Sequence, residues 1–592
     1  MIAVSRSTRR RTALAVLAVV ALVGVFVVRL VSIQIVQADE LNAQAFDKLS
    51  AQTETFGLRG DITDSDGTVL ASTVLTYDVT AAPNQVVDVE SKDSSGAVVT
   101  TTPRQIADQI GTITGVSGDQ IYAALTSDPT ANFAYVVKGI SVDQFRAIRD
   151  LGVDWLYYSS VPKRTYPNGA VAGSVVGFVG SDGTGQAGVE QLDQTCLAGT
   201  DGVQSYLRSG DNGGVAIPGS TETTVQAQDG GTVVLTLDSD LQYFAQQTLA
   251  ARVQEVQGAW GTVVVQEVKT GKLLAVADYP SVDPNNVDAT DAADRGSIAF
   301  QAPFEPGSTF KALTAASLVD SGTANVGTQV EAPYIFTDSN GASTKDSEFH
   351  TDPLRLTLAG VIQESSNTGT AMLGEQMSAE QRYDYMMKFH LGEPSEVGFP
   401  AESGGIIHPW DEWDDQTNMT TTFGQGLSTT AVQVASMYQA LGNGGVRLPV
   451  QLVEGCKQAD GTMTDAPAAS AGEQLVSPQA ASDTVHMLET VVTGGYASKD
   501  LTIPGYRVAA KTGTAQMSDG NGAYGSSYIT SLAGLAPADD PQYVVSVTIA
   551  KPVTVESALA AAPVFQKIMS QVLKEHRVQP STVPAPDLPT TY

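Results

Sequence analysis

Cysteine and histidine are scarce in this sequence. It contains two cysteines, Cys196 and Cys456, and five histidines among 592 residues. The cysteines are far apart, so we predict no disulfide framework, assign them to different domains and leave their redox state open. Neither has a second Cys or a His at the spacing of metal ligands. We therefore expect no zinc site and no cofactor.

Positive charge is scarce as well. Lysine and arginine total 33 against 64 aspartates and glutamates, which gives a formal net charge of −31. A nucleic-acid partner is therefore not expected. The acidic excess is spread along the chain, and we interpret it as a solvated surface. With 42% apolar residues, the chain is long enough for two or three domains.

Long apolar runs are absent except near the N-terminus. There, four arginines between positions 6 and 11 precede a run that starts at Ala13 and continues through Arg29 to Val36. This length suits a transmembrane helix, and Arg29 can snorkel to the interface. We predict a cytoplasmic tail at 1–12, a single-pass anchor at 13–36 and an extracytoplasmic remainder. A cleaved signal peptide is the alternative, although residues 36–38 are a poor cleavage site.

Residues 37–225 mix short β-branched segments that we predict to be strands, such as 171–179, with turns rich in Gly, Asp, Ser and Thr. This pattern predicts an elongated α+β domain. Within it, we interpret Arg59 and Arg164 as partners of acidic neighbours that fix domain packing, with a catalytic role as the alternative. The polar stretch 210–231 is predicted to be a linker or an interdomain hairpin.

Residues 226–576 are predicted to form one domain in which strands from both ends enclose a helical middle. This order indicates an α+β fold with one five-stranded antiparallel sheet flanked by helices. An amphipathic helix is predicted at 560–576, and the Pro-rich tail 577–592 is predicted to be disordered. The predicted strands are residues 261–268, 272–277, 506–516, 529–536 and 543–551.

A serine and a lysine stand three residues apart at the predicted start of a helix. Ser308 follows Pro306-Gly307, and Lys311 shares its helical face. The amine can then reach the hydroxyl, and the positive end of the helix dipole favours a developing oxyanion. Lys311 can accept the proton only if desolvation or a nearby cation lowers its pKa. Ser308 is thus a candidate nucleophile and Lys311 its candidate base.

The Ser-x-x-Lys pattern alone is weak evidence for a catalytic site. Ser160 and Lys163 have the same spacing, but Pro162 between them opposes a helix. In an isolated match, a serine N-cap beside a solvated lysine is the more frequent arrangement. A Ser-His-Asp triad is the rival scheme, and the scattered histidines form no motif that supports it.

Two further motifs follow in an informative order. Ser365-Ser366-Asn367 lies in a polar break after an apolar helix, and Lys511-Thr512-Gly513-Thr514 lies in a predicted strand. A Ser365 hydroxyl can pass a proton to a leaving amine, and the Asn367 amide can hold a peptide group.

The Lys-Thr-Gly-Thr motif predicts a substrate-binding strand. Lys511 adds positive charge, the hydroxyls of Thr512 and Thr514 can bind a carboxylate, and Gly513 lets a substrate lie along the strand edge. Another Lys-Thr-Gly begins at Lys269, and we interpret it as a hairpin turn.

The three motifs, in this order, resemble those of the penicillin-binding proteins, and of their class B in particular, over residues 12–576. Residues 423–426, Phe-Gly-Gln-Gly, resemble the glycine-rich motif of that family. The segments at Arg59 and Arg164 resemble structural motifs of the class B pedestal domain. The Ser-Ser-Asn context is more similar to the division (septal) type than to the elongation type.

This resemblance implies that Ser308 attacks the carbonyl between two terminal D-alanines of a peptidoglycan stem peptide and forms an acyl-enzyme. An amine of a neighbouring stem peptide would then complete the cross-link. The backbone N–H groups of Ser308 and Thr514 would form the oxyanion hole. β-Lactam antibiotics would acylate Ser308, and a membrane-embedded glycosyltransferase and division proteins are the implied partners.

Several alternatives stay open on the sequence alone. A β-lactamase or a β-lactam sensor shares the motifs, although the large first domain and the single anchor favour neither. A D,D-carboxypeptidase differs only in using water as acceptor, and an elongation-type enzyme differs only in its place of action. From another class, the protein could serve mainly as a division scaffold. The acceptor amine and the oligomeric state are left undetermined.

Overall fold

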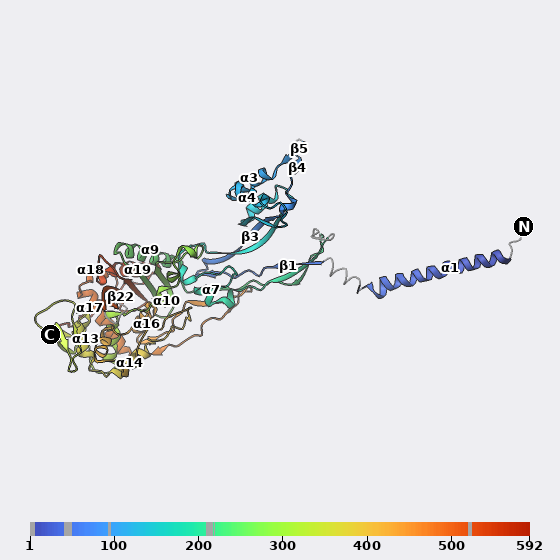
Figure 1. Cartoon of the computed structure of the whole chain (residues 1–592). Coiled ribbons are helices and arrows are strands. Elements are labelled where there is room, and N and C mark those ends of the chain that lie inside the picture. The colour runs from blue at the N-terminus through green and yellow to red at the C-terminus, as the bar shows by residue number, and fades with distance from the viewer. Residues whose placement is uncertain are drawn as a thin grey trace. The chain divides into compact units, whose positions relative to one another are not determined.

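The computed structural model of the chain describes residues 6–38, 40, 50–92, 96–208, 217, 219–518 and 524–592. It begins with helix α1 (Arg6–Val31), which continues as the π-helical turn η1 (Ser32–Val36) (Figure 1). Among the described residues, one segment, Arg9–Val36, is long and apolar enough to cross a membrane, with a mean hydropathy of 2.9. The predicted anchor at 13–36 lies within it. Residues 1–5 of the predicted cytoplasmic tail lie outside the described residues.

A first compact unit comprises the chain up to Leu58 together with residues 199–229. Its strands form a three-stranded antiparallel sheet in the order β1-β8-β9. The region 210–231, predicted to be a linker or an interdomain hairpin, contains β9, which pairs with β8 before this region, so its described part supplies one strand of a hairpin. Residues 210–216 and 218 of this region lie outside the described residues. The strands are β1 (Ser50–Thr55), β8 (Gly202–Leu207) and β9 (Glu222–Val225).

The second unit comprises residues 59–198 and 230–592 and contains a seven-stranded sheet, here called the seam sheet. Its order is β19-β18-β10-β2-β3-β6, and β7 also pairs with β3. β10 is parallel to β2 and antiparallel to β18, so strands from distant parts of the sequence meet there. The strands are β2 (Ile62–Thr63), β3 (Val69–Ala81), β6 (Ala134–Ile140), β7 (Leu156–Thr165), β10 (Thr232–Leu235), β18 (Val453–Lys457) and β19 (Met463–Thr464).

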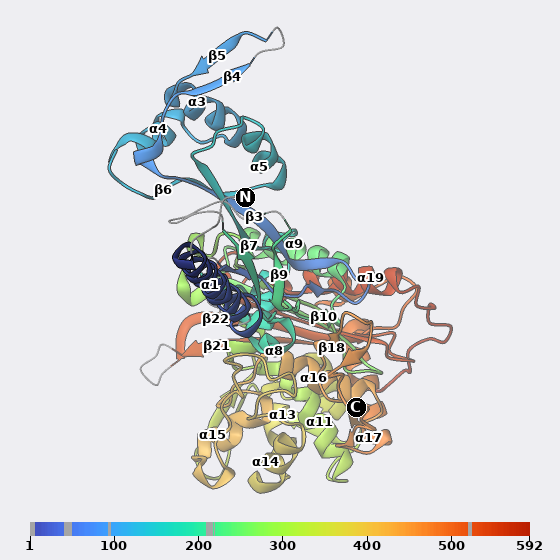
Figure 2. The same ribbon diagram turned by 90° about the vertical axis from the view of Figure 1, so that its right-hand side faces the viewer.

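β3, β6 and β7 extend from the rest of the seam sheet into a small lobe (Figure 2). Its helices α3 (Pro103–Thr114), α4 (Gly118–Thr126) and α5 (Val142–Arg149) pack around a separate apolar core that includes Ile110 and Ile121. Capping boxes at the N-termini of α3 and α5 fix where these helices begin. The lobe also carries η2 (Pro83–Gln85), β4 (Val89–Lys92) and β5 (Val98–Thr101).

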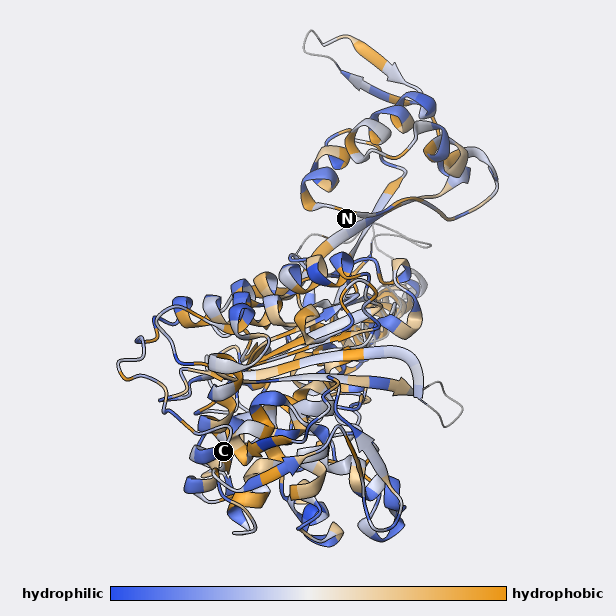
Figure 3. Cartoon of the chain, turned by 90° about the vertical axis from the view of Figure 1, so that its left-hand side faces the viewer, coloured by the Kyte–Doolittle hydropathy of each residue, from blue (hydrophilic) through white to orange (hydrophobic). Residues whose placement is uncertain are grey.

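The centre of the second unit is a five-stranded antiparallel sheet in the order β12-β11-β23-β22-β21. Alternate residues of β11 enter different cores: Val263 packs with α9 and α19, and Val264 packs with α11, α16 and α17. Apolar residues accordingly colour the strands between the two helical layers in Figure 3. The predicted α+β fold is confirmed. The elements are β11 (Trp260–Glu267), β12 (Leu273–Tyr279), β21 (Ala509–Ser518), β22 (Tyr524–Ala536), β23 (Tyr543–Ala550), α9 (Ser239–Glu255), α11 (Lys311–Asp320), α16 (Ala431–Gly442), α17 (Pro478–Gly494) and α19 (Ala562–Glu575).

The remaining elements lie mostly between the two strand groups of this sheet. The helices are α6 (Gly173–Val176), α7 (Gly188–Leu192), α8 (Gln194–Leu197), α10 (Ile298–Gln301), α12 (Leu358–Glu364), α13 (Asn367–Gly374), α14 (Ala379–Lys388), α15 (Asp415–Thr420) and α18 (Ser498–Leu501). The 3-10 turns are η3 (Val287–Ala289), η4 (Ala292–Asp294), η5 (Gly307–Phe310), η6 (Trp410–Glu412), η7 (Thr421–Phe423) and η8 (Ala558–Ala560). The short strands are β13 (Gln329–Ala332), β14 (Ile335–Thr337), β15 (Ser343–Lys345), β16 (Leu354–Thr357), β17 (Val446–Arg447) and β20 (Glu473–Gln474).

The two cysteines form a disulfide, so the prediction of no disulfide framework is wrong. Cys196 in α8 is joined to Cys456 in β18 with a Cα–Cα distance of 5.9 Å. They meet because β18 pairs with β10, and Gly231, just before β10, donates its backbone N–H to the Cys196 carbonyl at 2.8 Å. Sequence spacing gave no indication of this contact, since 260 residues separate the pair.

Two further predictions are corrected by the structure. Residues 171–179 were expected to form a strand, but the buried apolar run includes helix α6, since such runs do not distinguish strand from helix by periodicity. The Pro-rich tail 577–592 was expected to be disordered, but it follows the surface in a defined path. The Leu588 side chain packs against the main core, and the backbone at Thr591 bridges Leu356.

Candidate active site

Ser308 lies in the 3-10 turn η5, which leads directly into α11. The sequence predicts Ser308 at the start of this helix, and the structure differs in that the first turn is tighter. Gly307 precedes it with a φ of 56°, a conformation that glycine adopts without strain. Side chains three residues apart eclipse in a 3-10 turn, so Lys311 stays on the side of Ser308.

The predicted glycine-rich motif at 423–426 packs against this turn and binds its backbone. The Gly307 N–H donates to the Gly424 carbonyl at 2.9 Å. A Cβ at Gly424 would lie 2.3 Å from the Gly307 oxygen, so only glycine fits there. The buried Tyr438 hydroxyl donates to the Thr309 carbonyl at 2.9 Å. The nucleophile turn is therefore fixed by contacts outside its own helix.

Lys311 and Lys511 converge on Ser365. The Lys311 Nζ donates to the Ser365 carbonyl at 2.6 Å and to Asn367 Oδ1 at 2.7 Å, and it lies 3.5 Å from Ser365 Oγ. The Lys511 Nζ donates to Ser365 Oγ at 2.8 Å and to the Thr512 carbonyl at 3.1 Å. The Ser365 hydroxyl thus lies within reach of both amines.

Both lysines are fully buried, and neither forms an ion pair within the described part of the chain. Burial, followed by the nearby charge of Lys511, lowers the pKa of Lys311 well below its usual value, and Asp346 opposes this shift. Burial also lowers the pKa of Lys511 to about 7. The condition that the sequence sets for Lys311 as a base, a lowered pKa, is therefore met.

Asp346 orients the Ser365-Ser366-Asn367 motif, and sequence reasoning missed it. Its buried carboxylate accepts the backbone N–H of Asn367 at 2.6 Å and that of Thr368 at 3.0 Å, which satisfies the first turn of α13. It also accepts the Ser366 hydroxyl at 3.0 Å. Asp346 belongs to no sequence motif, and only the fold brings it to the helix from more than 20 positions away.

The Lys511–Thr514 motif lies on β21, the edge strand of the central sheet. One side of β21 pairs with β22, and its other side faces no further strand of this sheet in the described part of the chain. Gly513 is required by packing as well as by access, since a Cβ there would lie 2.3 Å from Ser531 Oγ. An extended peptide can add to such an edge as a further strand.

A cavity of about 660 Å³ opens beside this edge. Ser308, Ser365 and Asn367 line it together with Thr512, Gly513 and Thr514, so the structure brings all these predicted residues to one site, and the two lysines lie buried at its base. Sequence reasoning missed the acidic and aromatic lining. These missed residues are Glu348, Glu364, Tyr496, Tyr528 and Glu556.

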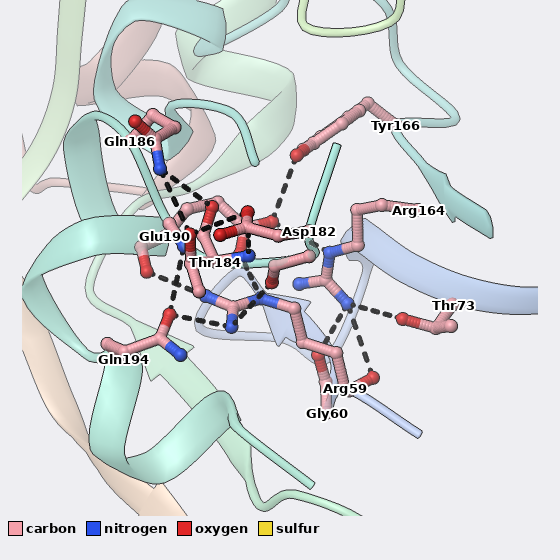
Figure 4. Close-up of polar contacts among 12 residues, drawn as sticks. Arg59, Gly60, Thr73, Arg164, Tyr166, Asp182, Thr184, Gln186, Glu190 and Gln194 are labelled. Atoms are coloured by element: carbon pink, nitrogen blue, oxygen red, sulfur yellow. Dashed lines mark hydrogen bonds and ion pairs between the residues drawn. The ribbon is translucent and has the colours of Figure 1, made fainter. Parts of the chain in front are cut away.

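The predicted structural arginines form a separate buried cluster, drawn in Figure 4. Arg59 Nε and Arg164 Nε donate to the two carboxylate oxygens of Glu190 at 2.6 and 2.7 Å. Arg164 also donates to the Gly60 carbonyl at 2.6 Å, and the Tyr166 hydroxyl donates to Glu190 at 3.1 Å. The interpretation of these arginines as partners of an acidic group is confirmed.

The other Ser-x-x-Lys and Lys-Thr-Gly matches lie outside the site. Ser160 and Lys163 are on strand β7, where the spacing no longer places them on one helical face. Lys269 lies in the turn between β11 and β12, as the sequence predicts.

Comparison with protein families gives two matches. The model of the penicillin-binding protein transpeptidase domain matches residues 261–570, and the model of the penicillin-binding protein dimerisation domain matches residues 54–235.

Relatives match along most of the chain. Penicillin-binding protein PbpB of Mycolicibacterium smegmatis is 33% identical, over 98% of this chain and 92% of its own. Peptidoglycan D,D-transpeptidase FtsI of Escherichia coli K12 is 30% identical, over 89% and 85%. Penicillin-binding protein 3 of Mycobacterium tuberculosis, solved with aztreonam, is 28% identical with a TM-score of 0.68, over 91% of this chain and all of that one. The apolar helix and these relatives together indicate a membrane-anchored protein. The chain therefore belongs to the class B penicillin-binding proteins, with a dimerisation domain followed by a transpeptidase domain.

Proposed function

We propose that this enzyme is a serine-type D,D-transpeptidase that cross-links peptidoglycan stem peptides through an acyl-enzyme at Ser308, in septal wall synthesis. One observation carries the proposal. Two buried lysines, which have no ion pair among the described residues, meet at Ser365 in the cavity that Ser308 lines. Burial without an anion lowers the pKa of an amine and favours its neutral form, which a base for a hydroxyl proton requires.

In acylation, neutral Lys311 takes the Ser308 hydroxyl proton while Oγ attacks the carbonyl of the penultimate D-alanine. The tetrahedral intermediate collapses, the peptide bond breaks, and the leaving D-alanine amine needs one proton. Ser365 Oγ lies 3.5 Å from the Lys311 Nζ, so the proton can pass from Lys311 through the Ser365 hydroxyl to the leaving amine. The acyl-enzyme forms, D-alanine leaves, and no proton is gained or lost.

The second stem peptide then reverses these steps. Its amine attacks the acyl carbonyl and passes a proton to the lysine–serine pair, which returns it to Ser308 Oγ. The donor peptide lies along the edge of β21, where the hydroxyls of Thr512 and Thr514 bind its terminal carboxylate and the Asn367 amide holds its backbone. The backbone N–H groups of Ser308 and Thr514 stabilise the oxyanion.

We further propose that the N-terminus is cytoplasmic and the catalytic domain extracytoplasmic, beside a membrane-embedded glycosyltransferase and division proteins. The four arginines in the first turns of α1 support this orientation. The disulfide supports it too, since such bonds persist in oxidising compartments. A membrane-impermeant lysine reagent on intact cells should label the catalytic domain. Failure to label it would contradict the proposed orientation.

The test of the activity is acylation of the full-length protein by a fluorescent penicillin. We expect one stable adduct that peptide mapping places on Ser308, and none with Ser308→Ala. Attachment elsewhere would overturn the assignment of the nucleophile, and rapid hydrolysis of the adduct would indicate a β-lactamase. Incubation with stem peptides and an acceptor amine separates cross-linking from carboxypeptidase release. Rescue of a depleted strain by Ser308→Ala would favour the scaffold function.

A further inference from the structure

The C-terminal residues are integrated into the transpeptidase domain at a point that leads to the active site. The Thr357 N–H donates to the Thr590 carbonyl at 3.1 Å, and the Thr357 hydroxyl donates to the Pro589 carbonyl at 2.6 Å. Thr591 forms a β-bridge with Leu356. Residues 588–592, here called the C-terminal strap, thereby lie along the end of β16.

Thr357 is also the N-cap of α12. Its Oγ1 accepts the Gly360 N–H at 3.1 Å while donating to the strap. One hydroxyl thus joins the first turn of the helix to the strap.

Gly360 shows how closely the strap approaches this helix. A Cβ on Gly360 would lie 1.8 Å from the Thr590 carbonyl oxygen. Its next neighbour outside the strap, a Leu356 methyl group, is 3.3 Å away. Gly360 is therefore the residue that admits the strap, and glycine is otherwise unfavourable inside a helix.

The far end of α12 carries the catalytic serine motif. The helix ends at Glu364, and Ser365 is its C-cap with a φ of 56°. Seven residues rise about 10 Å, so a displacement at the start of so short a rod is transmitted to its end. At that end, the Ser365 carbonyl and hydroxyl hold Lys311 and Lys511 at 2.6 and 2.8 Å.

We propose that the C-terminal strap is a positioning element that holds α12 in register and thereby sets Ser365 between the two lysines. This inference rests on the proposed acylation at Ser308 and adds to it a distant determinant of the rate. Leu588 in the main core and the Arg355 guanidinium, 4.6 Å from the centre of the Tyr592 ring, hold the two ends of the strap.

The first test compares the full chain with a chain ending at Asp587, both in detergent. Penicillin acylation is followed by stopped flow, which separates initial binding from the acylation step. We expect the acylation rate constant to fall about tenfold, as misplaced catalytic groups lower rates strongly, with initial binding nearly unchanged. The acidic limb of the rate profile should move to higher pH, because water entering around Lys311 weakens the desolvation that lowers its pKa.

The second test uses Gly360→Ala in both chains as a double-mutant cycle. In the full chain the new methyl group collides with Thr590, so acylation should fall. In the shortened chain the methyl group meets no strap, and alanine should be neutral or should stabilise α12. Coupling between the two changes is the signature of the strap. If the shortened chain does not fold, Leu588→Ala in the full chain loosens the same segment.

The outcomes separate this inference from the proposed function. No acylation of the full chain would contradict the function itself. Equal rates and pH profiles in the full and shortened chains, with only a lower melting temperature, would make the strap a simple stabiliser and overturn the proposal. Gly360→Ala effects that are the same in both chains would overturn it as well.

Discussion

Two pairs of cationic side chains in the described part of the chain lie away from solvent and have opposite surroundings. Arg59 and Arg164 share the carboxylate of Glu190, whose side chain is fully buried, and they also bind backbone carbonyls. Within the described residues, the amines of Lys311 and Lys511 donate only to hydroxyl, carbonyl and amide oxygens. The carboxylate of Glu190 balances the charge of the two arginines. The two lysines have no such anion in their direct contacts with the residues that the structure describes, so their pKa values are lowered.

This difference distinguishes structure from chemistry. Arginine keeps its charge in a protein, so two arginines that share a buried carboxylate make a rigid joint. Buried lysine without an anion has a lowered pKa and can exchange protons near neutral pH. The paired cluster therefore fixes packing, and the unpaired one marks the active site.

The largest effect is expected where the exchange of protons is abolished. Lys311→Arg keeps a cation but removes its ability to be neutral, so acylation by penicillin should slow about 10²–10⁴-fold. Lys163→Arg, at the other Ser-x-x-Lys match on β7, is the matched control and should leave the rate unchanged. A Lys311→Arg enzyme with the normal rate would show that Lys311 is not the base.

Removing the anion of the paired cluster should act on stability alone. Glu190→Gln leaves two buried guanidinium groups without their carboxylate, which should lower the free energy of unfolding by about 3–5 kcal/mol. Chemical denaturation measures this loss, and titration with fluorescent penicillin counts the folded sites. The acylation rate per folded site should not change, and a large change would show that the cluster also acts on catalysis.

Removing one of the unpaired lysines should change the free energy of unfolding in the opposite direction. Lys511→Met relieves the burial of an amine and should raise the free energy of unfolding at pH 7 by about 1–2 kcal/mol, while acylation slows. Loss of stability together with loss of rate would indicate that Lys511 is a structural cation like Arg164.

The most gradual effect is the dependence of stability on pH. The pKa of Lys511 is about 7 in the folded protein and near 10.4 in an unfolded chain, so the unfolded state binds more protons between these values. Stability should therefore rise with pH across this window, by about 1.4 kcal/mol per pH unit for this one group. The difference in unfolding free energy between wild type and Lys511→Met isolates the slope. A flat difference from pH 7 to 10 would contradict a neutral buried Lys511.

The sequence singled out the four cationic residues and the order of the motifs, because these are local patterns with known chemistry. It could not place Asp346, which acts on Asn367 and Thr368 through backbone N–H groups and belongs to no motif. The disulfide was missed because its cysteines meet only through the pairing of β10 with β18. The strap was taken for a disordered tail because its order comes from backbone bonds and from the space at Gly360, which composition does not encode.

The seam sheet limits how this protein can be divided or exchanged. β10 lies in the region matched by the dimerisation family and β18 in the region matched by the transpeptidase family, and the two strands pair. A fragment of residues 261–570 would expose the edge of β18 and leave Cys456 without its partner, which invites aggregation. The catalytic region is therefore not an interchangeable cassette. Recombination between related genes should preserve function only where both regions come from the same parent, or where the β10–β18 pairing and its cysteines are carried across together.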